Sequence, residues 1–413
     1  MTAKISVIMP TRNRLHLLRH AVQSVQAQTF RDVEIVLSDN CSEDGTQSWG
    51  QSLAQSDARI KYVRAPEPLG MRESWEFAAQ HATATQITFL GDDDAFSRDC
   101  LSQAWNRMNE HQVPLVVWRY GNYFHPSWPE ANRCNSLLLL PFTGEIKVCS
   151  AYETLEQAFQ TVATVRWPHL SNAIHHRHLL DKVRARLDCL FPSGLGDHFT
   201  STMILRFAEK YVYIDRPMSL YGWWQGSFSS AVMQQNLQAV QRLVSADEKL
   251  HGVPMQMRLW SNLFASSLLM AQKYLTENTT GFQLNWTRYF INCFNEIQAV
   301  KERGLDVTAL EQEFNATLAA QPDEIRTKVQ QAFQRQQTKS VRTRLRETIN
   351  RWPVWFRWEA KLRPKLQKDR AVLLHGKQLG FHNIAECASQ MDVWTNPDIT
   401  RAHQFGFATQ GMP

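Results

Sequence analysis

Long apolar stretches are what this sequence lacks most clearly. No apolar run in its 413 residues approaches the roughly 20 residues that a membrane-spanning helix needs, and the leucine-rich run at 137–142 is far too short. The first residues, MTAKISVIMPTRNR, pass directly into a strand-like run and lack the apolar core and cleavage site of a signal peptide. We therefore expect a cytoplasmic location, with a peripheral position at the inner face of the plasma membrane as the alternative.

The sequence also lacks the spacings with which cysteine and histidine bind metals. Its seven cysteines are scattered and odd in number, which is typical of structural thiols in a reducing cytosol. The four histidines between 169 and 178 lack the paired spacing and third ligand of a zinc site. We expect surface or packing roles for them, with Asn172 and His176 as weak candidates for an acceptor site.

A strong charge is confined to one segment. The net charge is +6, but residues 335–370 carry twelve Lys or Arg and three acidic residues, so the remainder of the chain is −3. Within 339–370 the basic residues alternate with Trp352, Trp355 and Trp358. Such a pattern suits the interface of an anionic membrane, although nucleic-acid binding uses similar chemistry and a helical arm packed on the protein is the alternative. We expect a membrane surface rather than a nucleic acid as the partner.

The first hundred residues alternate strand and helix patterns, in a composition typical of a soluble globular protein. The expected strands are 5–10, 33–39, 60–65 and 86–90, and the expected helices are 14–28, 43–56 and 70–82. Strands that alternate with helices predict a parallel sheet covered on both faces. Ligands of such sheets bind at the carboxyl ends of the strands.

The pattern changes twice along the chain. From 97 to about 235 it is mixed, with expected strands at 113–120 and 211–215 and expected helices at 151–163, 175–187 and 196–210. Beyond 236 strand patterns almost vanish, and Gln-, Leu- and Glu-rich stretches predict helices. We therefore expect a domain over 1–235, with halves 1–96 and 97–235, and a mostly helical region over 236–413.

Three adjacent carboxylates follow the fourth expected strand. Asp92, Asp93 and Asp94 carry like charges, which repel one another unless a cation lies nearby. Mg²⁺ and Mn²⁺ prefer carboxylate oxygens, and Mg²⁺ takes one or two carboxylates beside phosphate oxygens and water. A metal held against a diphosphate is the favoured interpretation, and a solvated acidic turn before the helix near Ser97 is the alternative.

Polar residues also follow the first and second strands. Asp39 suits a hydrogen bond to a nucleobase or ribose, although Ser42 and Asp44 beside it also suit simple capping of the next helix. Because the ends of parallel strands meet at one edge of a sheet, we expect Asp39 near the three aspartates.

Four motifs in the first hundred residues resemble those of a known protein family. SVIMPTRNR, VLSDNCSEDGT, LGMRESWEFA and FLGDDD, in this order and spacing, resemble the family 2 glycosyltransferases with the GT-A fold, over roughly residues 4–235. The resemblance implies a Rossmann-like mixed sheet of the nucleotide-diphospho-sugar transferase type. It also implies an inverting transfer of a sugar from a UDP-, dTDP- or GDP-linked donor to an acceptor hydroxyl, with Mn²⁺ or Mg²⁺ bound beside the donor.

The same resemblance implies roles for residues of the donor half. Pro10, Thr11 and Asn13 would lie against the nucleotide, and Asp39 would read its base. Arg72 could pair with a phosphate, although a surface arginine is an equal alternative.

The acidic motif would bind ribose and metal. Because three consecutive aspartates allow two alignments, Asp92 or Asp93 would face the ribose and Asp94 or Asp93 the metal. Which of them contacts the metal stays open at this point.

An inverting transfer needs a base that takes the acceptor proton. Related family members place an acid-containing motif where this chain has FPSGLGDHFTS, so we predict Asp197 as the base and His198, which titrates near neutrality, as the second candidate. A plain helix N-cap is the alternative for Asp197. In the expected loop 221–229, Trp223 or Trp224 would stack on a sugar or, as the safer prediction, pack in the core.

These predictions describe a metal-dependent glycosyltransferase of cell-surface polysaccharide biosynthesis, such as O-antigen or capsule, that acts on a glycan or lipid-linked acceptor. The alternative is a non-catalytic scaffold of the same fold, docked at the membrane. A scaffold has no need of Asp39, Asp92 to Asp94 and Asp197 together.

Overall fold

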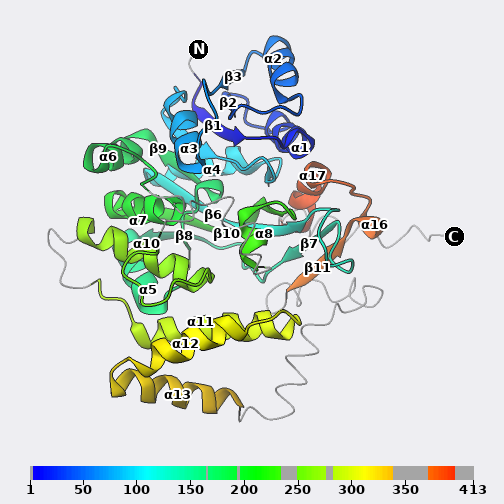
Figure 1. Ribbon diagram of the computed structural model, residues 1–413. Coiled ribbons are helices and arrows are strands. Elements are labelled where there is room, and N and C mark those ends of the chain that lie inside the picture. The colour runs from blue at the N-terminus through cyan, green and yellow to red at the C-terminus, as the bar shows by residue number, and fades with distance from the viewer. Residues whose placement is uncertain are drawn as a thin grey trace.

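A computed structural model describes residues 3–163, 166–192, 196–233, 249–275, 282–337 and 371–395. A mixed sheet of eleven strands runs through the molecule, with helices on both of its faces (Figure 1). Along its main path the strand order is β11-β7-β6-β9-β4-β1-β2-β3, and β10 joins β5, β6 and β8 beside this path.

The amino-terminal half of the sheet is parallel, as predicted. Its strands are β1 (Ile5–Thr11), β2 (Val33–Asp39), β3 (Ile60–Arg64) and β4 (Gln86–Phe89). The pairing of β1 with β2 begins at Ile5 and Val33 and ends at Thr11 and Asp39, so these two strands finish level with each other. Polar residues that follow them are thereby brought to one edge of the sheet.

Side chains of β1 alternate between two cores, because successive residues of a strand point to opposite faces. Val7 and Met9 pack with Leu18 of one helix layer, and Ile8 packs with Ala78 of the other. The helices that form these layers are α1 (Leu15–Gln26), α2 (Thr46–Ser56), α3 (Met71–Gln80) and α4 (Cys100–His111).

The following half is mixed, also as predicted. Its strands are β5 (Ala95–Phe96), β6 (Leu115–Phe124), β7 (Ser136–Leu139), β8 (Ile146–Ser150), β9 (Ala173–His176) and β10 (Lys210–Trp223). Strand β10 runs parallel to β6 and antiparallel to β5 and β8. It is longer than the predicted 211–215 and continues through Trp223, because β6 offers a partner along its whole length.

The helices of this half are α5 (Ala151–Thr161), the single turn η1 (Leu170–Asn172), α6 (Arg177–Leu187), α7 (Gly196–Ala208) and α8 (Phe228–Met233). The prediction of a helix from 175 was wrong at its start. Residues His175 and His176 belong to β9, which fills the space between β4 and β6 and pairs antiparallel with both. Tertiary pairing therefore overrides the local helical pattern at these positions.

In the carboxyl-terminal region, the described residues first form a series of helices, which confirms its helical character. They are α10 (Trp260–Leu275), α11 (Trp286–Glu302), α12 (Thr308–Ala319) and α13 (Asp323–Gln337). Helix α10 packs on α7, and Leu263 and Phe264 join Phe199 in one continuous core. The domain boundary near 235 stays a prediction, since residues 234–248 lie outside the described part of the chain.

The chain then returns to the sheet, against the prediction that strands end near 236. Strand β11 (Val372–His375) pairs antiparallel with β7, and the short α16 (Gly376–Leu379) and α17 (Ile384–Thr395) follow it. Helix α17 contacts α1 and β10. Strand β11 has only four residues, which is too few for a recognisable strand pattern in the sequence. Leu374 is buried because β11 pairs with β7, not because of a local alternation of apolar residues.

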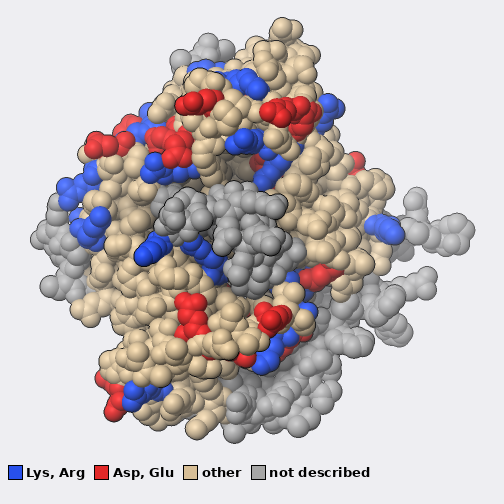
Figure 2. Space-filling view, viewed as in Figure 1, with Lys and Arg blue, Asp and Glu red and all other residues tan. Residues whose placement is uncertain are grey.

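Charges are mixed over the surface that Figure 2 shows, where Lys and Arg lie among Asp and Glu on the described residues. The basic, tryptophan-rich segment 339–370 lies outside the described residues. Among the helices that are described, none combines the length and the apolar composition needed to cross a bilayer.

Candidate active site

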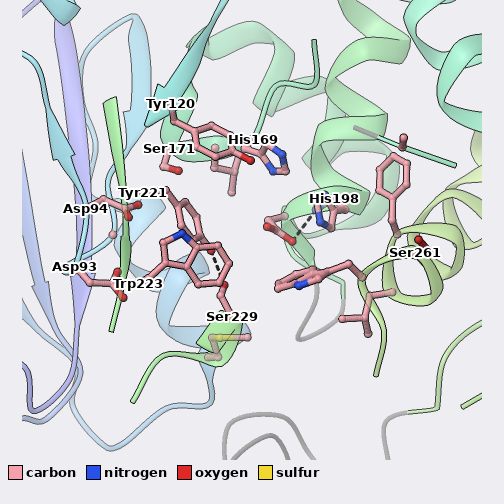
Figure 3. A pocket seen from close by; sticks show the side chains of 18 of the residues that line it. Asp93, Asp94, Tyr120, His169, Ser171, His198, Tyr221, Trp223, Ser229 and Ser261 are labelled. Atoms are coloured by element: carbon pink, nitrogen blue, oxygen red, sulfur yellow. Dashed lines mark hydrogen bonds between the residues drawn. The ribbon is translucent and has the colours of Figure 1, made fainter. Parts of the chain in front are cut away.

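A cavity of about 710 Å³ lies where the sheet edge meets the carboxyl-terminal helices. Its lining comes from the loop after β4, from the start of α3, from β6 and β10, and from α7, α10 and α11. Figure 3 shows Asp93 and Asp94 on one side and His169 and His198 on the other, with the rings of Tyr221 and Trp223 between them in this view. The predicted donor and acceptor halves therefore share one cavity.

The first of the three aspartates already has a cation. Asp92 accepts a hydrogen bond from Thr11 Oγ1 at 2.8 Å and one from Arg14 Nη1 at 3.0 Å. The charge of Asp92 raises the pKa of Arg14, in opposition to burial, which lowers it. Arg14 also lies 5.0 Å from the ring centre of Trp224. Arg14 was not among the predicted site residues, although its position just after the first strand was a usable signal.

The other two aspartates face the cavity. Asp94 accepts a hydrogen bond from the backbone N–H of Gly222 at 2.9 Å, and the ring of His125 lies 3.1 Å from the carbonyl oxygen of Asp93. Burial, followed by the charge of Asp92, raises the pKa of Asp93 to about 7. Burial and the charge of Asp93 raise the pKa of Asp94 well above its usual range. The charge of Arg14, 3.9 Å from Asp93, lowers the pKa of that carboxyl only in part, and no cation pairs with Asp94 within the described residues.

This donor set fits a divalent cation. Buried carboxylates keep their charge only when a positive group lies beside them, and Arg14, 3.9 Å from Asp93, is committed to Asp92 at 3.0 Å. Asp93 and Asp94 offer oxygen ligands of the kind that Mg²⁺ and Mn²⁺ prefer. They are the residues that would hold such an ion, whereas Asp92 is engaged elsewhere.

A glycine permits the close contact that holds this loop. A Cβ atom at Gly222 would lie 1.7 Å from the backbone oxygen of Asp93, a distance that no side chain tolerates. Strand β10 therefore approaches the aspartate loop directly, and its N–H reaches Asp94. Position 222 requires glycine for this reason.

Asp39 ends β2 and is held by its own partners in the protein. Its side chain is fully buried and accepts hydrogen bonds from Ser42 N at 2.8 Å and from Tyr62 Oη at 2.7 Å. It also forms an ion pair with Arg64. Asp39 does not line the cavity, so its contact with a nucleobase stays a prediction.

The remaining donor-side candidates lie near the ends of the first strand and at α3. Pro10 and Thr11 close β1, and Asn13, with a φ of 54°, accepts a hydrogen bond from Glu43 N at 2.7 Å. Arg72 lines the cavity and pairs with Glu73 at 2.7 Å. The Glu73 side chain is exposed, and no ion pair joins Arg72 to a buried acid within the described residues. Arg72 therefore stays a candidate for binding a phosphate.

The predicted bases lie on the opposite wall. Asp197 is exposed in the first turn of α7, and one of its oxygens accepts a hydrogen bond from His198 N at 2.8 Å. The His198 side chain is buried, and its Nδ1 has no hydrogen-bond partner among the described residues. His169 joins this pair, and its ring centre lies 5.1 Å from that of His198.

Two weaker acceptor-site candidates do not line the cavity. Asn172 is buried and donates to the backbone oxygen of Trp118 at 2.7 Å, and His176 contacts His178 through Nδ1 atoms 2.7 Å apart. Neither belongs to the lining, whereas His169 and Ser171 do. Local sequence does not tell which histidine of 169–178 turns inward, since η1 and β9 decide it.

Aromatic and helical contributions complete the cavity. Tyr221 bonds Ser229 Oγ at 2.5 Å, and Trp223 Nε1 donates to Asn122 at 2.9 Å, so both rings are held at the lining. Trp223 is a wall residue rather than a core residue. Glu296 of α11 accepts hydrogen bonds from the backbone N–H groups of Trp260 and Ser261, which fixes the start of α10 at the cavity. That residues of α10 and α11 line the cavity was not predicted from the sequence.

Comparison with known proteins finds similarity over part of the chain. Residues 6–161 match the sequence profile described as Glycosyl transferase family 2. A GalNAc(5)-diNAcBac-PP-undecaprenol beta-1,3-glucosyltransferase of Campylobacter jejuni is 40% identical over 108 residues, which are 26% of this chain and 35% of that protein. The Escherichia coli UDP-Glc:alpha-D-GlcNAc-diphosphoundecaprenol beta-1,3-glucosyltransferase WfgD is 29% identical over 119 residues, 29% of this chain and 45% of that protein. The chain thus spans less than half the length of these two relatives.

Among solved structures, Staphylococcus aureus TarS 1–349 in complex with UDP-GlcNAc is similar at 18% identity and a TM-score of 0.47, over 80% of this chain and 92% of that one. The family resemblance of the sequence is confirmed by the profile match, and the mixed sheet with its helical carboxyl-terminal region confirms the expected fold class.

Proposed function

We propose that this protein is an inverting glycosyltransferase, because residues 6–161 match the sequence profile Glycosyl transferase family 2. It transfers a sugar from a nucleotide-linked donor to a hydroxyl group of an acceptor. The observation that carries the proposal is the cavity, because a buried carboxylate pair, Asp93 and Asp94, and the exposed carboxylate of Asp197 line the same space. A donor diphosphate and an acceptor hydroxyl need these two kinds of group on opposite sides of the reacting carbon.

On the donor side, Asp93 and Asp94 hold Mn²⁺ or Mg²⁺. The ion, when bound, neutralises charge on the diphosphate as it leaves. Arg14 holds Asp92 in place by its hydrogen bond, and the N–H of Gly222 orients Asp94. Thr11, Asn13 and Asp39 remain our candidates for the nucleoside.

On the acceptor side, Asp197 removes the proton of the attacking hydroxyl. Its carboxylate is exposed at the start of α7, and the backbone N–H of His198 holds one oxygen. The second oxygen is then available for the hydroxyl proton. His198 is the second candidate, although burial of its ring makes it less accessible to an acceptor than Asp197.

The acceptor is a glycan or a lipid-linked glycan of cell-surface polysaccharide synthesis. The two related glucosyltransferases, whose names specify undecaprenol-linked acceptors, support this choice. The lining includes Trp75, Phe191 and Phe264, which suit the apolar faces of sugar rings. Segment 339–370 would bring the enzyme to an anionic membrane, and its deletion should then release the protein from anionic liposomes but leave donor binding unchanged.

Nucleotide-dependent thermal stabilisation tests the proposal. UDP, dTDP and GDP, each with and without Mn²⁺, should be compared, because a ligand that binds only the folded state raises the melting temperature. We expect one nucleotide to stabilise the protein in the presence of Mn²⁺, and the corresponding nucleotide-sugar to be turned over. Asp197→Asn should abolish transfer while it retains nucleotide binding. Stabilisation by none of the three would leave the non-catalytic scaffold as the better explanation.

A further inference from the structure

Three side chains on the acceptor wall form a cluster that the proposed transfer does not need in full. His169, Asp197 and His198 each offer one ligand atom, and these atoms all lie within 4.8 Å of one another. The residues come from two separate elements, since His169 precedes η1 and the other two open α7. The spacing within 169–178 alone contains no such cluster, so the fold creates it.

One histidine of this cluster has a buried ring nitrogen without a hydrogen-bond partner in the described residues. His198 is 7% exposed, and its Nδ1 has no hydrogen-bond partner within the described residues. A buried ring nitrogen without a partner is costly unless a ligand satisfies it.

Two imidazoles and one carboxylate are a donor set for a borderline transition metal. Imidazole suits Zn²⁺, Cu²⁺, Fe²⁺ and Ni²⁺, whereas Mg²⁺ and Ca²⁺ prefer oxygen ligands alone. A tetrahedral zinc site, with ligands at roughly 2.0–2.2 Å, holds its donor atoms about 3.3 Å apart. The three donor atoms, all within 4.8 Å of one another, have to close to this span when an ion binds, and the exposed side chain of Asp197 can rotate toward the histidines.

We propose that His169, Asp197 and His198 bind a divalent transition metal of the zinc type, at a site separate from the Asp93 and Asp94 pair. Three protein ligands leave one position open to the cavity, as in zinc sites that accept water or a substrate oxygen. The ion engages the carboxylate of Asp197, so metal binding and free-base function of this residue exclude each other. The inference goes beyond the proposed transfer and does not need it.

Cobalt binding to the full chain tests this site. Co²⁺, a spectroscopic substitute for Zn²⁺, is titrated into the protein without nucleotide and followed by its visible absorption, and Zn²⁺ is then added in competition. We expect saturation at one ion per chain in the nitrogen-containing site and displacement by Zn²⁺. His169→Gln should weaken Co²⁺ binding by about tenfold or more, since even outer-shell changes cost 10–100-fold.

Two control variants make the result specific. His176→Gln removes a ring from the other close histidine pair, His176 and His178, and should leave the Co²⁺ titration unchanged. Asp93→Asn should leave the absorption band unchanged, because Asp93 belongs to the oxygen-ligand site. If His169→Gln binds Co²⁺ as tightly as the unmodified protein, or if the band disappears in His176→Gln instead, the proposed site is wrong.

Each variant is also checked for folding by circular dichroism and for Mn²⁺-dependent nucleotide binding. Loss of the Co²⁺ band in a folded His169→Gln protein that still binds nucleotide supports the site. Nucleotide binding without any histidine-dependent Co²⁺ site overturns this inference but leaves the proposed transfer intact. A Co²⁺ site without nucleotide binding does the reverse.

Discussion

Arg14 and Asp92 form an ion pair of 3.0 Å whose partners are 78 residues apart in the sequence. The side chain of Asp92 is 6% exposed and that of Arg14 is 23% exposed, so the pair lies largely out of water. Of three adjacent aspartates, one therefore has a permanent cation supplied by the protein. The other two keep the demand for a positive charge that their neighbours impose.

Removal of one partner of this pair should destabilise the protein. Arg14→Gln leaves the buried carboxylate of Asp92 with Thr11 as its remaining donor, and we expect the free energy of unfolding to fall by about 2 kcal/mol, less than for a fully buried pair. Urea unfolding measures this. The double variant with Asp92→Asn should be more stable than the sum of the single effects predicts. Strict additivity would mean that the two charges do not interact.

The two cavity-facing aspartates should differ from Asp92 in metal binding. Asp93→Asn and Asp94→Asn each remove an oxygen ligand, and we expect the Mn²⁺ concentration required for half-maximal nucleotide binding to rise by at least about tenfold. Asp92→Asn should shift it much less, because its carboxylate faces Arg14 and Thr11. Isothermal titration at several Mn²⁺ concentrations checks this. An equal effect of all three substitutions would contradict the assignment.

Gly222 should not tolerate a methyl group. Gly222→Ala would place Cβ against the backbone oxygen of Asp93, so β10 or the aspartate loop must move. We expect loss of Mn²⁺-dependent nucleotide binding together with a lower melting temperature. Gly121→Ala is the matched control in β6, since a Cβ there meets only the ends of Leu137, Leu139 and Leu220 at 2.9 to 3.1 Å. The control should retain nucleotide binding, and similar losses in both variants would remove the argument from close approach.

Docking of α17 should depend on pH. Asp392 of α17 lies against Asp99, which also pairs with Arg216 at 2.8 Å. Burial, followed by its hydrogen bond with Asp99, raises the pKa of Asp392 to about 7, whereas the pKa of Asp99 is lowered despite burial by its hydrogen bond with Asp392 and the charge of Arg216. The pair therefore shares one proton below about pH 7, and Arg216 balances the remaining charge.

The sign of the effect follows from the raised pKa. The folded state binds this proton more tightly than the unfolded chain, so the stabilisation is fully present below the usual aspartate pKa and is lost as the pH rises through about 7. We expect amide exchange in α17, corrected for intrinsic rates, to accelerate between pH 6 and about 8. Asp392→Asn should abolish this acceleration, because an amide donates to Asp99 at every pH. A pH dependence that survives the substitution would exclude this carboxyl pair as its cause.

Local patterns were sufficient for the first half of the sheet and for the aspartate motif. Short apolar runs place β1, β2 and β4, and the polar residues after them meet at one edge because parallel strands end together. The partners of those residues were not predictable in the same way. Arg14 reaches Asp92, and Gly222 reaches Asp94, across 78 and 128 residues of chain, and no periodicity encodes such pairs.

The remaining features of the site depend on tertiary contacts that local sequence patterns do not encode. The four histidines of 169–178 look alike in the sequence, yet His175 is buried in β9, His176 bonds His178, and His169 turns into the cavity. Likewise, the contribution of α10 depends on Glu296, which caps it from a different helix. The burial of a residue and the direction of its side chain depend on neighbours that the chain supplies much later.

Strand β7 can pair with β11 only late in the synthesis of the chain. About 230 residues separate the two strands, so at roughly 5–20 residues per second a ribosome needs on the order of 10 to 50 s to make the second after the first. Throughout that interval the edge of β7, with Leu137 and Leu139 beside it, has no strand to cover it. An uncovered apolar edge is a template for other chains. Nascent or truncated chains that end before β11 should therefore be the aggregation-prone forms of this protein.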